Sequence, residues 1–531
     1  MSEKDEAMPG YEGVTATELG VNSASVATFI VFSKAFSIVV GGLTFIAVAR
    51  LLGPSSYGIY TIAMGMAGFI GAFGSISIGQ YLNKYIPELL IKKETERIKR
   101  MLGAAVIVNL AAILVVILLS AIFARQILQF FFHNTVAEVL VYVTLVYLFV
   151  SAFYGLGGNV LISFADGKGS AVAQVINISI QAAMSISLVL LGYGAFGAIV
   201  GCLMGLLFGL VYQILRILHH SAISLKGVWI EARKMLGFSV PLTLSGIVGS
   251  AVNNFSILYL SIFFLPGVVG LYGVASKIGT YIDLVTGSIS AILIPMFSAA
   301  LASKHIKDKL GRFYDYSLYF GFLFALPIVV YISIFSNAMI ISVFTSTYNG
   351  ASLYIAAIGI GILLGLFASY ASSLSISAGY IMQVFKFGIA TSMLELLALL
   401  VLIPMFGVTG LIISIYYVGA LAADAFYLYF LIHTLKLKSQ FGIIRLIATN
   451  AVLAAILLPI AFLDIKATYQ LLLGVLILVF VYPMLLGAFR AISTKELELL
   501  RKVVSALPVF GAWLNAIIIY AELFQRESNG L

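Results

Sequence analysis

Long apolar runs separated by short polar or charged breaks fill most of this chain. One α-helix needs roughly 20 apolar residues to cross a bilayer, and each run is close to or above that length. Gly, Pro or charged residues mark every break. The pattern predicts an all-α polytopic membrane protein with about fourteen transmembrane helices, at 27–51, 57–81, 101–123, 136–160, 170–191, 194–218, 235–264, 268–298, 313–336, 350–375, 386–405, 408–432, 445–463 and 469–490.

The composition agrees with this pattern and removes several classes of site. Of 531 residues, 62% are hydrophobic and 10% charged, whereas soluble domains are about 45–50% apolar and about a quarter charged. The single cysteine, Cys202, rules out a disulfide framework. Gly167-Lys168 lacks the Ser or Thr that follows the Lys of a phosphate-binding loop, and adjacent His219-His220 would point apart on a helix. We therefore expect neither a cofactor nor a metal.

The basic residues report the orientation of the helices. The net charge is +9, which could suggest nucleic acid, but in a membrane protein it usually reflects topology and contact with anionic lipid. The even-numbered connections and the C-terminal tail hold 24 of the 30 Lys and Arg residues. By the positive-inside rule, this multi-pass protein of the cell membrane has both termini in the cytoplasm, with membrane lipid and not nucleic acid as a partner.

An internal repeat at an offset of 212–213 residues organises the chain. Pro54-Ser-Ser-Tyr-Gly58-Ile-Tyr60 aligns with Pro266-Gly-Val-Val-Gly270-Leu-Tyr272. Farther on, Tyr193-Gly194-Ala-Phe-Gly197 aligns with Phe406-Gly407-Val-Thr-Gly410. Each half holds six predicted helices, so both halves cross the membrane in the same direction, as parallel repeats do. Transporters built in this way carry their substrate path between the halves.

The repeat gives the expected domain organisation. An acidic cytoplasmic tail covers 1–26, and the N-terminal six-helix lobe covers 27–225. The C-terminal six-helix lobe covers 226–440, and 441–490 adds helices 13 and 14. The remainder, 491–531, is expected to be a cytoplasmic or interfacial tail; its apolar stretch is interrupted by Pro and Gly, which favours an interfacial helix over a fifteenth span.

Two segments identify a family resemblance. Ala49-Arg-Leu-Leu-Gly-Pro54-Ser-Ser-Tyr-Gly-Ile-Tyr60 resembles the signature of the polysaccharide biosynthesis proteins, the O-antigen-type oligosaccharide flippases of the multidrug/oligosaccharidyl-lipid/polysaccharide exporter superfamily. The segments at 191–197 and 403–410 extend the resemblance. It implies two six-helix lobes arranged as a V around a central cavity, plus an appended helix pair. It also implies a flippase, not an enzyme, that moves a polyprenyl-(pyro)phosphate-linked oligosaccharide from the inner to the outer leaflet by alternating access.

Charged residues inside predicted spans are the first candidates for a site, because an ion in hydrocarbon costs several kcal/mol, roughly 2.5–3.5 on insertion scales. Lys34 and Lys277 are candidates for binding the substrate's anionic pyrophosphate. Snorkelling to the interface is the competing explanation for Lys34. The candidates for coupling transport to a proton or a monovalent cation are Asp283, Glu395 and Asp424.

Amide side chains could bind sugar hydroxyls. The candidates are Asn253 and Asn254 in the seventh predicted helix and Gln181 in the fifth. Polar contacts between helices explain such residues equally well. A monomer is the expected oligomeric state.

Two other functions stay open at this point. A cation-coupled antiporter of small organic molecules would share the architecture, but the related drug exporters carry a carboxylate in the first helix, and here no Asp or Glu lies between Glu18 and Glu88. A membrane-embedded glycosyltransferase or polymerase would need a cluster of carboxylates or a sizeable outer loop, and the predicted outer loops are short.

Overall fold

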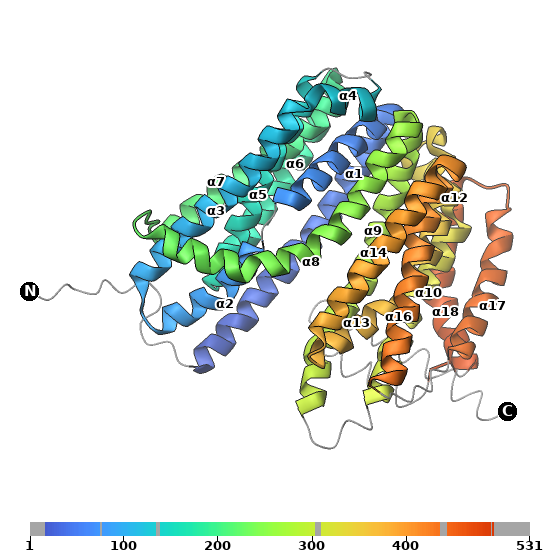
Figure 1. The fold of residues 1–531 in the computed structure, drawn as a ribbon. Coiled ribbons are helices and arrows are strands. Elements are labelled where there is room, and N and C mark those ends of the chain that lie inside the picture. Colours follow the sequence, from blue (N-terminus) through green and yellow to red (C-terminus); the bar gives the residue numbers. More distant parts are fainter. Residues whose placement is uncertain are drawn as a thin grey trace, which may run out of the picture. The chain divides into compact units, whose positions relative to one another are not determined.

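The computed structural model describes residues 16–74, 77–133, 138–302, 310–435, 443–489 and 491–492, and every regular element within them is helical (Figure 1). Within these ranges, ten helical segments are long and apolar enough to cross a membrane. Two of them, Phe29–Gly74 and Gly167–His220, contain 46 and 54 residues. Each therefore contains about 70–80 Å of helix in total, enough to cross the roughly 30 Å of bilayer hydrocarbon twice. Each predicted span overlaps a described helix, which confirms the predicted fold class.

The chain divides into two compact units, Met1–Gly270 and Leu271–Leu531. The N-terminal unit contains α1 (Ala16–Gly74), α2 (Ile78–Ile91), α3 (Thr95–Ile122), α4 (Ala124–Phe132), α5 (Val139–Ser163), α6 (Gly167–Leu188), η1 (Val189–Tyr193), α7 (Gly194–His220), α8 (Val228–Phe263) and the start of α9 (Pro266–Ala302). Its core lies where α2, α3, α5 and α8 meet, around the buried side chains of Leu82, Met101, Leu161 and Met235. The seventh long helix, α8, thus packs with the first six.

The C-terminal unit holds the rest of α9 and the later helices. These are α10 (Leu310–Ile334), α11 (Ser336–Met339), η3 (Ile340–Phe344), η4 (Ser346–Tyr348), α12 (Ala351–Leu364), α13 (Leu366–Ser377), α14 (Ile381–Phe406), α15 (Val408–Ile412), η5 (Ile413–Gly419), α16 (Ala420–His433), α17 (Ile444–Ala461) and α18 (Ala467–Ala488). Its core joins α10, α13 and α17 through buried Leu323, Tyr370, Leu374 and Leu453. The helix pair α17–α18 packs against α10 and is therefore part of this unit.

Glycines at the predicted turns adopt backbone conformations that other residues rarely do. Gly53 interrupts α1 with φ 68° and ψ 171°, and Pro54 starts the next helical stretch. Pro suits a first helical position because its φ is already fixed there and its missing N–H would be unpaired. Gly194 and Gly407, which the repeat aligns, have nearly the same conformation, at φ 55° and ψ −139° and at φ 59° and ψ −130°. The aligned turns are therefore alike in backbone as well as in sequence.

The other aligned pair makes a reciprocal contact. A Cβ added to Gly58 would overlap the Pro266 carbonyl oxygen, and one added to Gly270 would overlap the Pro54 carbonyl oxygen. Pro54 aligns with Pro266 and Gly58 with Gly270, so each segment offers its partner the same glycine and the same carbonyl. The two aligned segments therefore make the same contact in both directions.

Some boundaries differ from the sequence prediction. The first helix begins at Ala16, not at 27. Extending a helix that has already formed avoids the free-energy cost of nucleation, so the helix can continue beyond the apolar span. The second span ends at Gly74, and a separate helix, α2, continues to Ile91. A short helix, α4, fills the connection after α3. Most of the predicted C-terminal tail lies outside the described residues.

Candidate functional site

The N-terminal unit contains an open cavity of about 680 Å³ between α1, α2, α3, α5 and α8, with both polar and apolar residues in its wall. Pockets for small ligands run from about 300 to 1,000 Å³, so this volume is sufficient for a ligand. The walls are formed by Met64, Ala67, Gly68, Gly71, Ala72, Ser77, Ile78, Gly79, Gln80, Asn109, Ile113, Tyr147, Leu148, Ser151, Ala152, Gly155, Leu156, Asn159, Ser250 and Asn254.

One face of α1 and one face of α5 form two of the cavity walls. Met64, Ala67, Gly68 and Gly71 recur at helical spacing along α1. On α5 the corresponding face carries Leu148, Ser151, Ala152, Gly155 and Asn159. A Cβ on Gly155 would meet nothing within 4 Å, so this part of α5 borders open space. The helical period of each segment thus turns one row of side chains toward the cavity.

Two glycines let amide side chains approach the backbone closely. A Cβ on Gly68 would overlap the Asn254 amide, and one on Gly79 would lie 2.6 Å from Asn159 Oδ1. Asn254 Nδ2 donates to the Ser250 carbonyl at 2.8 Å, and Asn159 Nδ2 donates to the Gly155 carbonyl at 2.8 Å. These contacts fix both amides against the cavity wall.

A short polar chain extends from Asn159 toward the end of α5. Asn83 Nδ2 donates to Asn159 Oδ1 at 3.4 Å, and Ser163 Oγ donates to Asn83 Oδ1 at 2.7 Å. Asn109 is different. It is only 5% exposed, and its Nδ2 has no hydrogen-bond partner among the described residues. An unpaired buried donor costs about 1–3 kcal/mol, and this one belongs to a residue that lines the cavity.

The described cavity wall combines amide and hydroxyl groups with apolar side chains and has no charged group. None of the described residues that line the cavity is Asp, Glu, Lys, Arg or His. Amides and hydroxyls supply both donors and acceptors. Such a lining suits a neutral ligand rich in hydroxyl groups better than an organic cation, which would need a carboxylate or an aromatic cage.

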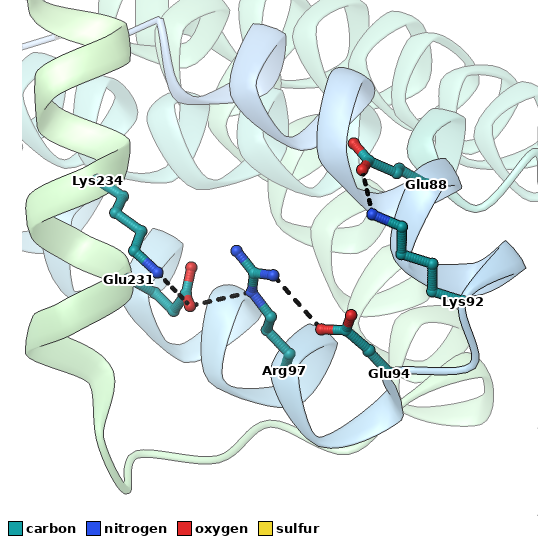
Figure 2. Close-up of polar contacts among 6 residues, drawn as sticks. All are labelled: Glu88, Lys92, Glu94, Arg97, Glu231 and Lys234. Carbon is teal, nitrogen blue, oxygen red and sulfur yellow. Dashed lines mark hydrogen bonds and ion pairs between the residues drawn. The ribbon is translucent and has the colours of Figure 1, made fainter.

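Ion pairs hold α8 against α3 at the face predicted to be cytoplasmic (Figure 2). Glu231, with only 7% of its side chain exposed, accepts from Arg97 Nε at 3.1 Å and from Lys234 Nζ at 3.5 Å. Arg97 also pairs with Glu94 at 3.4 Å. The network fixes the beginning of α8, the helix that contributes Ser250 and Asn254 to the cavity.

A second cluster joins α6 to the end of α7. Asp166 caps α6 by accepting from the Gly169 N–H at 2.8 Å. The same carboxylate accepts from Arg216 Nε at 2.6 Å and His220 Nε2 at 2.8 Å. Burial by itself would raise the pKa of Asp166, but the hydrogen bonds from His220, Arg216 and Gly169 outweigh it and hold that pKa well below its usual range. Residues 166–169 are thus a helix start, and in the described residues no group of three His, Cys, Asp or Glu could hold a metal ion.

The sequence candidates of the N-terminal unit are not brought together. Asn254 lines the cavity, whereas its neighbour Asn253 is exposed and does not. Gln181 of α6 contacts α7 instead, where its Nε2 donates a hydrogen bond to Cys202 Sγ at 3.4 Å. Lys34 is exposed on the first stretch of α1.

The candidates of the C-terminal unit have different surroundings. Asp424 Oδ1 accepts from the Ala368 N–H at 2.8 Å and so caps α13 from a neighbouring helix. Glu395 lies against Gly419, where a Cβ would overlap its carboxylate. That glycine ends the π-helical segment η5, and such segments are frequent at functional sites. Asp283 is exposed, and its Oδ1 accepts a hydrogen bond from Thr286 Oγ1 at 3.4 Å. Lys277 is exposed on α9.

The sequence analysis missed most of the cavity's amides. Gln80, Asn109 and Asn159 were not among its candidates. The available signal was polarity alone, since Asn109 and Asn159 each interrupt a long apolar run. Of the amides expected from the sequence, Asn253, Asn254 and Gln181, only Asn254 lines the cavity.

Comparison with known proteins agrees with the fold. The sequence model of the polysaccharide biosynthesis protein family matches residues 47–353. No curated protein matches the sequence. Among solved structures, the lipid II flippase MurJ in an inward closed conformation superimposes with a TM-score of 0.70 at 15% identity, covering 87% of this chain and 98% of MurJ.

Two multidrug transporters are also similar. An inward-facing MATE transporter of the MOP superfamily gives a TM-score of 0.61 at 16% identity, covering 75% of this chain and 95% of its own. A mutant of the Vibrio cholerae MATE transporter VcmN gives a TM-score of 0.52 at 14% identity, covering 79% of this chain and 100% of its own. At these identities the likeness concerns the fold.

Proposed function

The chain belongs to the polysaccharide biosynthesis protein family, and from this premise we propose that it is a flippase. It translocates a polyprenyl-(pyro)phosphate-linked oligosaccharide from the inner to the outer leaflet by alternating access. The observation that carries the proposal is the uncharged cavity of about 680 Å³, whose wall presents amides and hydroxyls among glycines and apolar side chains. A sugar headgroup cannot cross hydrocarbon unaided, since each unpaired polar group there costs several kcal/mol.

The amides would replace water around the sugar. Asn109 Nδ2 is unpartnered among the described residues and would donate to a sugar hydroxyl or ring oxygen. Gln80 and Asn159 line neighbouring positions and can both donate and accept. Tyr147 adds an aromatic wall. Neutral partners would bind the headgroup without the desolvation cost of ions, so release on the other side stays easy.

Each unit contributes a lysine that we assign to the phosphate of the carrier. Lys34 is exposed on α1, and Lys277 is exposed on α9. A lysine is a point charge that attracts phosphate without demanding bidentate geometry. We assign coupling to a proton or a monovalent cation to Glu395, with Asp283 and Asp424 as the other candidates. Asp424 already accepts a backbone hydrogen bond, so Glu395 is the better carrier.

A cation-coupled antiporter of small organic molecules is the alternative. The similarity to MATE transporters concerns the fold and does not decide between the two functions. The cavity lining does favour one, because the described residues that form it offer no carboxylate to an organic cation.

The test is transport by the purified chain in proteoliposomes, measured as the rate at which a fluorescent lipid-linked oligosaccharide becomes accessible to an added glycosidase. Asn109→Leu removes an amide that has no protein partner at Nδ2, so folding should not suffer. The transport rate should fall about fivefold to tenfold, the equivalent of roughly 1–1.5 kcal/mol for one hydrogen bond. Asn450→Leu, at a buried amide of α17 outside the cavity, is the matched control and should retain its rate.

An unchanged rate in the Asn109→Leu, Asn159→Leu double variant would remove the cavity from the transport path. Export of an organic cation, combined with no movement of the lipid-linked sugar, would establish the alternative function.

A further inference from the structure

The N-terminal unit contains a second pocket, of about 370 Å³, between α3, α5 and α7. In contrast to the polar cavity, every described residue that lines it is apolar. Phe149 and Phe153 form one wall with ring centroids 5.0 Å apart. A water molecule would find no hydrogen-bond partner there, so the pocket does not suit water. Its chemistry selects a hydrocarbon chain.

The position of the pocket places this chain in one leaflet. Leu102 lines the pocket about 10 Å from the start of α3, and Val160 lines it about 5 Å before the end of α5, taking 1.5 Å per residue. Ile223, which follows the end of α7, closes the same side. These helix ends form the face predicted to be cytoplasmic, so the pocket lies at the depth of the inner leaflet.

Two observations select the kind of chain. Leu156 of α5 lines both pockets, so the apolar pocket and the polar cavity share one helix as their wall. Two basic residues lie on the cytoplasmic side of the pocket. Arg100 precedes Leu102 in α3 and has its Cδ 3.4 Å from the Cβ position of Gly227, and Lys226 comes three residues after Ile223. Arg100 and Lys226 are exposed, and neither belongs to the ion pairs of the described residues. An anionic group at the cytoplasmic end of the chain would lie on the same side of the membrane as both.

We propose that the apolar pocket between α3, α5 and α7 binds the hydrocarbon chain of the polyprenyl phosphate carrier in the inner leaflet. The inference rests on the proposed function, since it assigns the second part of the same substrate. The phosphate lies on the cytoplasmic side, as Arg100 and Lys226 do, and the sugar lies in the cavity on the other side of α5. The pocket gives the transporter a way to recognise the carrier apart from the sugar.

The first experiment measures binding without transport. A benzophenone amino acid replaces Phe153, and the chain is reconstituted in phosphatidylglycerol vesicles that contain polyprenyl monophosphate without sugar. The control carries the same group at Leu118, which is 61% exposed on α3 and does not line the pocket. After illumination, mass spectrometry should find polyprenyl phosphate enriched at least tenfold at position 153 relative to position 118. Equal lipid ratios at the two positions, or a crosslink to the chain's own residues, would overturn the proposal.

The second experiment fills the pocket. Ile214→Trp places a large side chain at its mouth, whereas Val211→Trp adds the same bulk one turn away, at a position that does not line it; the two residues are 45% and 54% exposed. Ile214→Trp should lower both the crosslinking yield and the transport rate about tenfold, and Val211→Trp should change neither. Equal effects of the two variants would contradict the pocket assignment. Enrichment at position 153 without transport of any lipid-linked sugar would instead refute the flippase function, so the two failures are distinguishable.

Discussion

The reciprocal contact between the aligned turns gives the sharpest structural prediction. Gly58→Ala would place a methyl group on the Pro266 carbonyl oxygen and 3.1 Å from Gly270 N. Gly270→Ala would place one on the Pro54 carbonyl oxygen and 3.0 Å from Gly58 N. Both obstacles are backbone atoms, which cannot rotate away as the end of a side chain can. Either change forces the two segments apart.

The cost follows from the required separation. Ordinary contact begins at 3.4 Å, so the turns must separate by about 1 Å or more at each site. Overpacking of this kind costs about 1–3 kcal/mol, and the better helix propensity of Ala returns up to about 1 kcal/mol. We expect each variant to be destabilised by about 1–2 kcal/mol. One separation makes room for both methyl groups, so the double variant should cost about 1 kcal/mol less than the sum.

Equilibrium unfolding in mixed detergent micelles measures these differences. Gly237→Ala is the control, since its Cβ would meet nothing within 4 Å and the residue is exposed on α8. It should be neutral or slightly stabilising. The reasoning fails if Gly58→Ala and Gly270→Ala behave like the control, or if their costs simply add, because either result would mean that the turns do not share one contact.

Three further predictions concern charged residues. Lys277→Ala should abolish complementation of a flippase-deficient strain while the protein still reaches the membrane, and Lys277→Arg should retain part of the activity. Full activity of the Lys34→Ala, Lys277→Ala double variant would exclude both lysines from phosphate binding. Glu395→Gln should flatten the pH or cation dependence of transport by proteoliposomes, whereas unchanged dependence in it and in Asp424→Asn would place coupling elsewhere. Asp166→Asn should lower stability at neutral pH by about 1–3 kcal/mol, since it weakens the bonds to Arg216 and His220. Because the folded-state pKa of Asp166 is lowered, this contribution is complete above its unfolded pKa of about 3.9 and is lost as the pH falls toward the folded value, so wild type and variant should converge only in acid.

Much of the fold could be predicted because the bilayer imposes it. Every span must satisfy its own backbone hydrogen bonds, which makes long apolar runs helices. Turns needing a positive φ select glycine, so Gly53, Gly194 and Gly407 mark reversals that were visible in the sequence. The helix starting at Ala16 and the added helix α4 were missed, since neither is required to cross hydrocarbon.

The sequence by itself determined which segments cross the membrane, where they turn and how the halves repeat. Only the tertiary structure decided which helix faces meet. Helical periodicity places Gly155 and Asn159 on one face of α5, but it does not say that Gly79 of α2 and Asn109 of α3 lie across from them. Periodicity also does not reveal that Asp424 caps α13, or that Gln181 forms a hydrogen bond with Cys202. The reason is physical: spacing within a helix is set by its own backbone, whereas contacts between helices depend on packing among many side chains at once.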